Sequence, residues 1–262
     1  MKKIIISIVL FLCIISLCNT PIVAVAEESV FNWYCVRNKD HLQPRLDSQI
    51  SFVEEYNGYY VDRKHDNSNT EKVIYLTFDA GYENGNIEKI LDVLKEEKVS
   101  AAFFVLENLV LKNPDLILRM VNEGHLVCNH TAKHPDVTKF ANIEDFKAEI
   151  ERLELIYKDV TGQEMKKYFR PPEGKFSRKS MKFASELGYK TIFWSFAYAD
   201  WDNNAQMSPA AAKKKIFDNT HNGEIMLLHP TSATNAEIMR DVIKQLKSEG
   251  YHFGTLDELT RG

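Results

Sequence analysis

The chain has 262 residues, with 33 basic and 37 acidic side chains and a formal net charge of −4 at pH 7. This acidic balance argues against a nucleic-acid partner, because phosphate binding requires a basic surface. The length is sufficient for one large hydrophobic core.

The first 26 residues have the features of a signal peptide. A basic start, "MKK", precedes an apolar run of 15 residues from Ile4 to Cys18, and the small residues "AVA" come before Glu27. An uncleaved anchor is the alternative, but about 20 apolar residues are needed to span a bilayer. We therefore expect a secreted or extracytoplasmic protein whose mature chain begins near Glu27 and carries 31 basic and 37 acidic residues, a formal charge of −6.

Residues 27–70 are expected to form an N-terminal extension. Scattered aromatic residues suggest that it wraps on the core, and the polar stretch "DRKHDNSNT" predicts a surface loop at its end. Outside the predicted signal peptide the cysteines are Cys35 and Cys128. Two free thiols and one disulfide both remain open, because nothing in the sequence shows that the two residues meet.

Strand and helix patterns alternate from residue 72 onward. Short runs rich in β-formers predict strands, and apolar residues at helical spacing, with cap residues at their ends, predict helices. The predicted strands are 72–78, 101–106, 125–129, 167–170, 190–196, 224–229 and 251–256. The predicted helices are 86–99, 113–124, one from Asn142 to a stop at Gly162, 177–188, 208–219 and 235–250.

This alternation forces parallel pairing, so the fold is either a closed β/α barrel or an open doubly wound sheet. Unusual polar residues lie at, or a few residues beyond, the C-terminal ends of five of the strands: Asp79, His130, Arg170, Asp200 and His229. Strand ends converge from several directions on the mouth of a barrel, whereas an open sheet binds ligands mainly where its strand order reverses. We therefore predict a distorted seven-stranded (β/α) barrel over residues 71–262, as a single domain with an N-terminal extension.

Two of these strand ends carry residues suited to metal binding and acid–base chemistry. In "HTAKH", His130 and His134 have the i, i+4 spacing that places two imidazoles on one face of a helical turn. Asp79 lies at the end of an apolar strand, where a carboxylate needs a partner or a function. Because Gly81 follows it, the alternative is that Asp79 caps a helix or forms a turn. Arg170, at another strand end, could pair with Asp79 and keep it ionised.

A third polar pair lies later in the chain. His229 ends the run "LLH", where a hydrogen-bonded interior histidine is the alternative to a catalytic one. Asp200, in "AYADW", offers a carboxylate that could raise the pKa of His229 and keep it a proton donor near neutral pH.

In this order the motifs resemble those of the polysaccharide deacetylases, carbohydrate esterase family four. The resemblance spans about residues 72–256 and rests on "TFDAG", "HTAKH", "RPPEG", "ADW" and "LLH". The wider stretch "TFDAGYENGN" and the extension are most similar to the peptidoglycan N-acetylmuramic acid deacetylases that form muramic δ-lactam in spore cortex.

The resemblance implies a role for each matching residue. His130 and His134 would bind a divalent metal, for which zinc is the first expectation. Asp79 would be the general base that activates water, and Arg170 would hold it. Amide hydrolysis also needs an acid at the leaving nitrogen and a positive centre for the oxyanion.

The remaining implied roles concern the acid and the substrate. His229 would protonate the departing amine, oriented by Asp200. The backbone N–H near Glu173 would stabilise the oxyanion, and Trp201 and Leu227 would line the slot for the acetyl methyl group.

Ala80 departs from the family pattern, in which most members have a second Asp that serves as the third metal ligand. Loss of an anionic ligand should weaken metal binding and leave the ion more electrophilic. We therefore expect a weakly bound, exchangeable metal whose coordination is completed by water, substrate or a neighbouring polar side chain.

The sequence thus predicts a metal-assisted hydrolase that removes acetyl groups from N-acetylmuramic acid in peptide-stripped peptidoglycan. It would bind peptidoglycan glycan strands as a monomer, in the cell wall or forespore envelope. The alternatives are an N-acetylglucosamine deacetylase acting on peptidoglycan or chitin-like chains, and a non-catalytic cell-wall binding module in which Ala80 marks a decayed site.

Overall fold

A computed structural model describes residues 28–36 and 40–261, so the predicted signal peptide lies outside the described residues. An eight-stranded sheet has the order β10-β3-β4-β5-β6-β8-β2, with β9 also paired to β3, and all its pairs are parallel. Its strands are β2 (Gly58–Tyr59), β3 (Lys72–Ala80), β4 (Ala102–Val105), β5 (Leu126–Asn129), β6 (Tyr168–Phe169), β8 (Lys190–Ile192), β9 (Glu224–Leu228) and β10 (Tyr251–Phe253).

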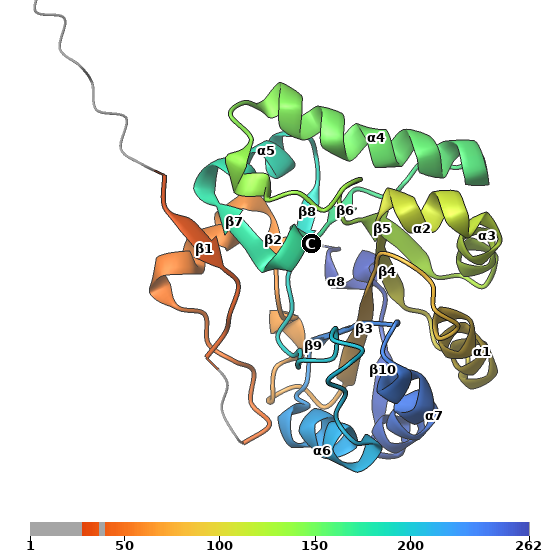
Figure 1. The fold of residues 1–262 in the computed structure, drawn as a ribbon. Coiled ribbons are helices and arrows are strands. Elements are labelled where there is room, and N and C mark those ends of the chain that lie inside the picture. The colour runs from red at the N-terminus through yellow and green to blue at the C-terminus, as the bar shows by residue number, and fades with distance from the viewer. Residues whose placement is uncertain (1–27, 37–39, 262) are drawn as a thin grey trace, which may run out of the picture.

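Helices surround this curled sheet (Figure 1). They are α1 (Ile87–Glu97), α2 (Glu107–Lys112), α3 (Pro114–Asn122), α4 (Ile143–Thr161), α5 (Arg178–Glu186), α6 (Pro209–Asn219), α7 (Ala233–Ser248) and α8 (Leu256–Leu259). Their ends follow from local chemistry, as α4 shows. The side chain of Asn142 accepts a hydrogen bond from the Asp145 N–H at 2.8 Å, and Gly162 ends the helix at φ 69°.

The segment after β8 closes the sheet into a distorted barrel. Phe193 N–H still donates to Tyr59 of β2, at 2.7 Å. Two residues later, Ser195 N–H donates to Ile225 of β9 at 3.0 Å, and Phe196 forms a parallel bridge with Met226. The chain therefore crosses from one neighbouring strand to another. This crossing explains why the strand predicted over 190–196 ends at Ile192.

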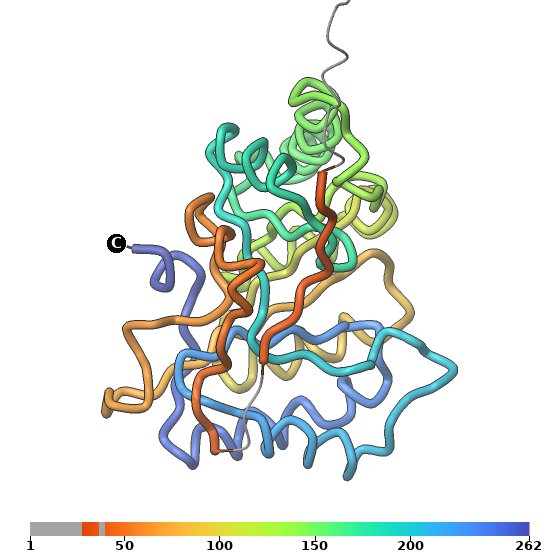
Figure 2. The backbone as a smooth tube through the Cα atoms, turned by 90° about the vertical axis from the view of Figure 1, so that its left-hand side faces the viewer, coloured from red at the N-terminus to blue at the C-terminus, as the bar shows by residue number. Residues whose placement is uncertain are grey.

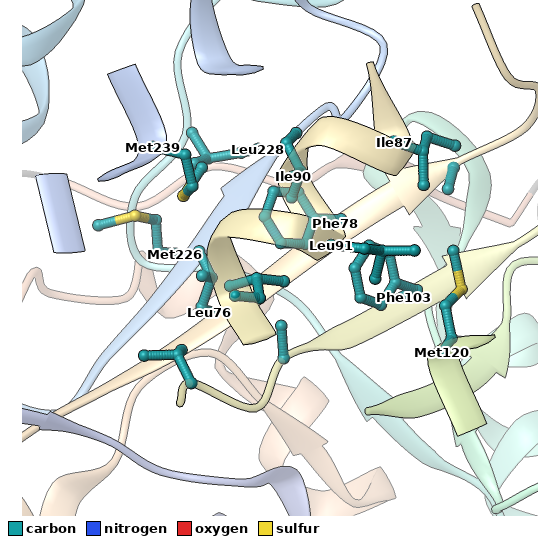
Figure 3. Packing of buried hydrophobic residues seen from close by; sticks show 14 of the residues in the cluster. Leu76, Phe78, Ile87, Ile90, Leu91, Phe103, Met120, Met226, Leu228 and Met239 are labelled. Atoms are coloured by element: carbon teal, nitrogen blue, oxygen red, sulfur yellow. The ribbon is translucent and has the colours of Figure 1, made fainter. Parts of the chain in front are cut away.

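The main hydrophobic core lies between the sheet and the helices. Alternate residues of β3 belong to it, including Leu76 and Phe78, because successive side chains of a strand point to opposite faces. Phe78 stacks on Phe103 of β4 with ring centroids 5.0 Å apart (Figure 3). Asp79 has the opposite parity and therefore shares the barrel-interior face with Thr77. The core thus fixes the direction in which the carboxylate points.

The N-terminal extension contributes strands to the fold in addition to packing on the core. It supplies β2 to the main sheet, and its first strand, β1 (Val30–Asn32), pairs antiparallel with β7 (Lys175–Ser177). Figure 2 looks onto the side of the barrel that the extension covers. The described part also has four 3-10 helices, η1 (Ser48–Tyr56), η2 (Arg63–His65), η3 (Val137–Lys139) and η4 (Pro172–Gly174).

All seven predicted strands and all six predicted helices are present, and the predicted distorted barrel is confirmed, with β2 of the extension as an eighth strand of its sheet. The last strand is shorter than predicted, because Thr255 caps α8 instead of continuing β10. Neither α2 nor α8 was predicted. No disulfide joins Cys35 to Cys128, which excludes the bridge left open above, and the Cys35 thiol donates to the Ser195 carbonyl at 3.5 Å. Among the described residues, no helix has the length and apolar character needed to cross a membrane.

Candidate active site

Asp79 lies at the carboxyl end of β3 and is paired with Arg170, as predicted. Its Oδ1 accepts a hydrogen bond from Nη1 of Arg170 at 2.8 Å, and its Oδ2 lies 3.6 Å from Nε2 of His130. Burial raises the pKa of Asp79, but the positive charge of Arg170, followed by His130 and His229, outweighs this and holds the pKa below its usual value. The carboxylate is therefore ionised at neutral pH and able to accept a proton.

Arg170 follows β6 and is completely buried. Its Nε donates to the Ile192 carbonyl at 2.8 Å, and its Nη2 donates to Thr77 Oγ1 at 2.9 Å. The guanidinium also lies 4.1 Å from the centroid of the Phe104 ring. Because a buried cation is stable only when its donors are satisfied, these contacts explain how the barrel interior holds Arg170 against Asp79.

His130 and His134 are brought together, but not by a helical turn. They lie in the loop after β5, in which Thr131 and His134 have positive φ values of 72° and 59°. The prediction of a helical turn was therefore wrong. The loop folds back because Asn129 Oδ1 accepts from the Thr131 N–H at 2.8 Å and Thr131 Oγ1 accepts from the His134 N–H at 2.9 Å. The two imidazole centroids lie 5.2 Å apart.

The state of His130 suits a metal ligand. Its Nδ1–H donates to the Arg170 carbonyl at 2.9 Å, which leaves the lone pair on Nε2. Burial is the main cause that lowers the pKa of His130 to about 4, so the ring is neutral at physiological pH. A neutral imidazole with its other nitrogen fixed by a carbonyl is the form that binds a divalent ion.

The two imidazoles fit a metal with several open positions. Within residues 28–36 and 40–261, no group of three or more His, Cys, Asp or Glu side chains is placed to hold an ion. Ala80 is fully buried in the apolar core and offers no ligand. The residues present are therefore compatible with a divalent ion held by few protein ligands.

His229 follows β9 and is held by Asp200. His229 Nδ1 lies 2.7 Å from Asp200 Oδ1, and the His229 backbone N–H donates to Asp200 Oδ2 at 2.8 Å. Burial lowers the pKa of His229, but the hydrogen bond and charge of Asp200, with a contribution from Asp79, outweigh this and raise it above its usual value. The proton on Nδ1 is directed at Asp200, so in the charged imidazole the second proton lies on Nε2, where it is available for transfer.

The three predicted substrate residues occupy different positions around these groups. Trp201 is 60% exposed, and its ring centroid lies 6.1 Å from that of His229. Leu227 is buried in β9 and shares the strand face of His229, two residues on. Glu173 lies in η4, three residues after Arg170, with a positive φ of 58°. Left-handed backbone at a non-glycine residue is strained and is often found at functional sites.

Sequence reasoning missed two polar residues that support the site. Thr77 accepts a hydrogen bond from Arg170. Residues two apart in a strand share one face, so its position two residues before Asp79 could have indicated this contact. Asn235 donates to Asp200 Oδ2 at 2.7 Å and to the His229 carbonyl at 3.1 Å. The sequence places Asn235 only at the start of a helix, so no local signal indicates this contact.

Comparison with known proteins gives concordant results. Residues 66–192 match the family model described as polysaccharide deacetylase. The chain is 41% identical over 238 residues to the peptidoglycan-N-acetylmuramic acid deacetylase PdaA of Bacillus subtilis, covering 90% of this chain and 88% of that protein.

Two solved structures share the fold. That of Bacillus subtilis PdaA, a family 4 carbohydrate esterase, superposes with a TM-score of 0.82 at 39% identity, over 88% of this chain and 96% of the other. A family 4 carbohydrate esterase from Bacillus anthracis gives a TM-score of 0.71 at 38% identity, over the same shares of the two chains. The sequence and the barrel therefore agree, and this chain belongs to the polysaccharide deacetylases, the family 4 carbohydrate esterases.

Proposed function

We propose that this chain is an exported, metal-dependent hydrolase that removes the acetyl group from N-acetylmuramic acid in peptidoglycan whose stem peptide has been removed. One observation carries the proposal: the Asp79 carboxylate and the His229 imidazole lie at strand ends of one barrel, Asp79 held by Arg170 and His229 by Asp200, which raises the pKa of His229. The 41% identity to a protein named for this substrate supports the choice of sugar. The predicted signal peptide supports action outside the cytoplasm, at the cell wall or forespore envelope, and we propose a monomer.

Each residue then has one task. Asp79 takes a proton from the attacking water, and Arg170 keeps the carboxylate ionised until it does so. A divalent ion, with zinc the first candidate, would be held by His130 and His134 and would polarise the acetyl carbonyl. His229 donates its Nε2 proton to the leaving nitrogen while Asp200 fixes the ring.

The substrate contacts complete the scheme. The backbone N–H at Glu173 would stabilise the oxyanion that forms when water adds to the carbonyl. Trp201 and Leu227 would line the slot for the acetyl methyl group. The freed amine of muramic acid can then form an amide bond with the lactyl carboxyl of the same sugar, which loses its C–O bond and releases water, to yield a δ-lactam. This ring can close only where no peptide occupies the carboxyl group.

The first experiment separates muramic acid from glucosamine as the substrate. Acetate release is measured on peptidoglycan before and after treatment with an amidase that removes the stem peptides. Release only after treatment, with lactam detected by mass spectrometry, is the expected result. Equal release from both preparations, without lactam, would identify a glucosamine deacetylase.

The Asp79→Asn variant tests the assignment of the base. It is expected to fold and to release no acetate, because an amide cannot accept the proton of water. Near-normal turnover would remove Asp79 from the mechanism. Retention of the wild-type protein on peptidoglycan without acetate release under any added metal would favour the non-catalytic binding module.

Metal affinity tests the consequence of Ala80. With two histidines as the protein ligands, the ion should be exchangeable, so dialysis against a chelator should remove it and added metal should restore activity. A stoichiometric zinc that survives extended chelation would contradict this expectation.

A further inference from the structure

The loop between β3 and α1, residues 81–86, has no task in the mechanism above. It begins two residues after Asp79 and carries Tyr82, whose side chain is aromatic and 44% exposed. Exposing a large aromatic ring to water has a free-energy cost, so an exposed ring held beside a reaction centre is a candidate contact for a ligand.

Tyr82 is fixed to the loop that carries Trp201. Asn203, two residues after Trp201, donates from Nδ2 to the Tyr82 hydroxyl at 2.7 Å. Because Asn203 is the donor in this bond, the phenol O–H remains available as a donor to a ligand. Trp201 itself is 60% exposed and lies beside His229. Two exposed aromatic side chains are therefore connected along the rim of the site.

The rest of the loop is anchored on two other sides. Asn84 and Asn86 both donate from Nδ2 to the Thr231 carbonyl, at 2.8 Å and 3.0 Å, and Thr231 lies two residues after His229. Asn108 of α2 donates to the Gly81 carbonyl at 3.1 Å. These bonds order the loop before a ligand arrives, so binding at Tyr82 would lose little conformational entropy.

We propose that Tyr82 forms a sugar subsite, in which the apolar face of a pyranose ring stacks on the phenol ring and the phenol O–H donates to a sugar oxygen. The occupant is the glycan-strand residue next to the sugar being deacetylated, and the proposal rests on the proposed function. The C–H groups on one face of a pyranose are apolar, which suits an aromatic surface. Tyr82 is joined through Asn203 to the loop of Trp201, which lies beside His229, so a strand whose reacting sugar lies at Asp79 and His229 can extend over Tyr82.

The test uses N-acetylmuramic acid alone and peptide-free glycan strands of increasing length, and measures the kcat and KM of acetate release. The Tyr82→Ala variant should lower kcat/KM on long strands about two- to twelvefold, through KM, because an aromatic contact contributes about 0.5–1.5 kcal/mol. It should leave kcat/KM on the monosaccharide, which has no neighbouring sugar, and the saturating kcat on long strands unchanged. Tyr82→Phe should retain most of the length effect because it keeps the ring.

The matched control is Leu155→Ala on α4, which removes an apolar side chain that is 63% exposed. It should change no parameter at any strand length. An equal loss for Tyr82→Ala on short and long strands, or no loss on either, would overturn the subsite.

The two proposals can fail separately. If the wild-type protein releases no acetate from any strand, the proposed function fails. Calorimetric binding of the same strands then still tests Tyr82: weaker binding of long strands alone by Tyr82→Ala supports the subsite, and unchanged binding refutes it.

Discussion

Replacing Asp200 with Asn should shift the pH range in which His229 acts as an acid. Asp200 is buried and accepts three hydrogen bonds, from the His229 backbone N–H, from His229 Nδ1 and from Asn235. An isosteric amide can place its oxygen where Oδ2 now lies and keep the bonds from the His229 backbone and Asn235. Its NH₂ group then faces Nδ1 of His229 and can only donate to it. This favours the neutral imidazole, in which Nδ1 accepts the hydrogen bond.

The size of the effect follows from the interaction that is lost. A hydrogen bond to a charged group contributes about 1.5–3 kcal/mol, and one pKa unit corresponds to about 1.4 kcal/mol. Loss of the bond from His229 Nδ1 to Asp200 should therefore lower the pKa of His229 by about 1–2 units. Burial already acts to lower the pKa of His229, and without the carboxylate of Asp200 less remains to counteract it.

The acid form of His229 is needed for catalysis, so activity is lost as the pH rises through its pKa. The basic limb of the kcat/KM profile should thus move to lower pH in Asp200→Asn. An NMR titration of His229 without substrate measures the same shift independently of turnover. Asp202→Asn, at an exposed position two residues on, is the control and should leave both curves unchanged. A basic limb and a titration curve that stay at the wild-type position would refute the reasoning.

The remaining predictions concern the buried charges, the metal site and the core. Arg170→Met should destabilise the fold by about 3–5 kcal/mol in urea unfolding, because the Asp79 carboxylate, only 11% exposed, loses its hydrogen-bonded cation; an unchanged midpoint would contradict this. Folding lowers the pKa of Asp79, which stabilises the folded state at pH values above the unfolded-state pKa. This stabilisation is lost as the pH falls through the folded-state pKa. Asp79→Asn should therefore flatten the acid side of the plot of unfolding free energy against pH. His130→Ala should weaken zinc binding in calorimetry while the circular dichroism spectrum stays native, and unaltered affinity would exclude His130 as a ligand. Phe103→Ala should cost about 3–5 kcal/mol but leave turnover per folded molecule unchanged, since Phe103 packs on the helix-facing side of the sheet; lost turnover would show that the core controls the site.

Much of the barrel could be predicted from the sequence because its elements depend on nearby residues. The helix from Asn142 to Gly162 has its cap and its stop in the local sequence, and both act as predicted. Asp79 could be placed at a strand end because the apolar run before it has strand character. Parallel pairing then brings strand ends together, which made the contact with Arg170 predictable.

The conformation of the histidine loop and the change of strand partners after β8 could not be predicted in this way. His130 and His134 meet through a loop with two positive φ values, and their spacing alone also fits a helical turn, which proved wrong. The strand after Lys190 ends early because residues 193–196 change partners from β2 to β9, and β2 itself comes from the extension.

The sequence by itself determined the order of strands and helices, the chemical character of the strand ends and the family pattern of motifs. Only the tertiary structure decided which polar groups satisfy one another, as with Asn235 on Asp200 and Thr77 on Arg170. The physical reason is that periodicity and capping act over a few residues. A buried charge is instead satisfied by whatever donor or acceptor the fold brings within 3 Å, here from positions 35 and 93 residues away.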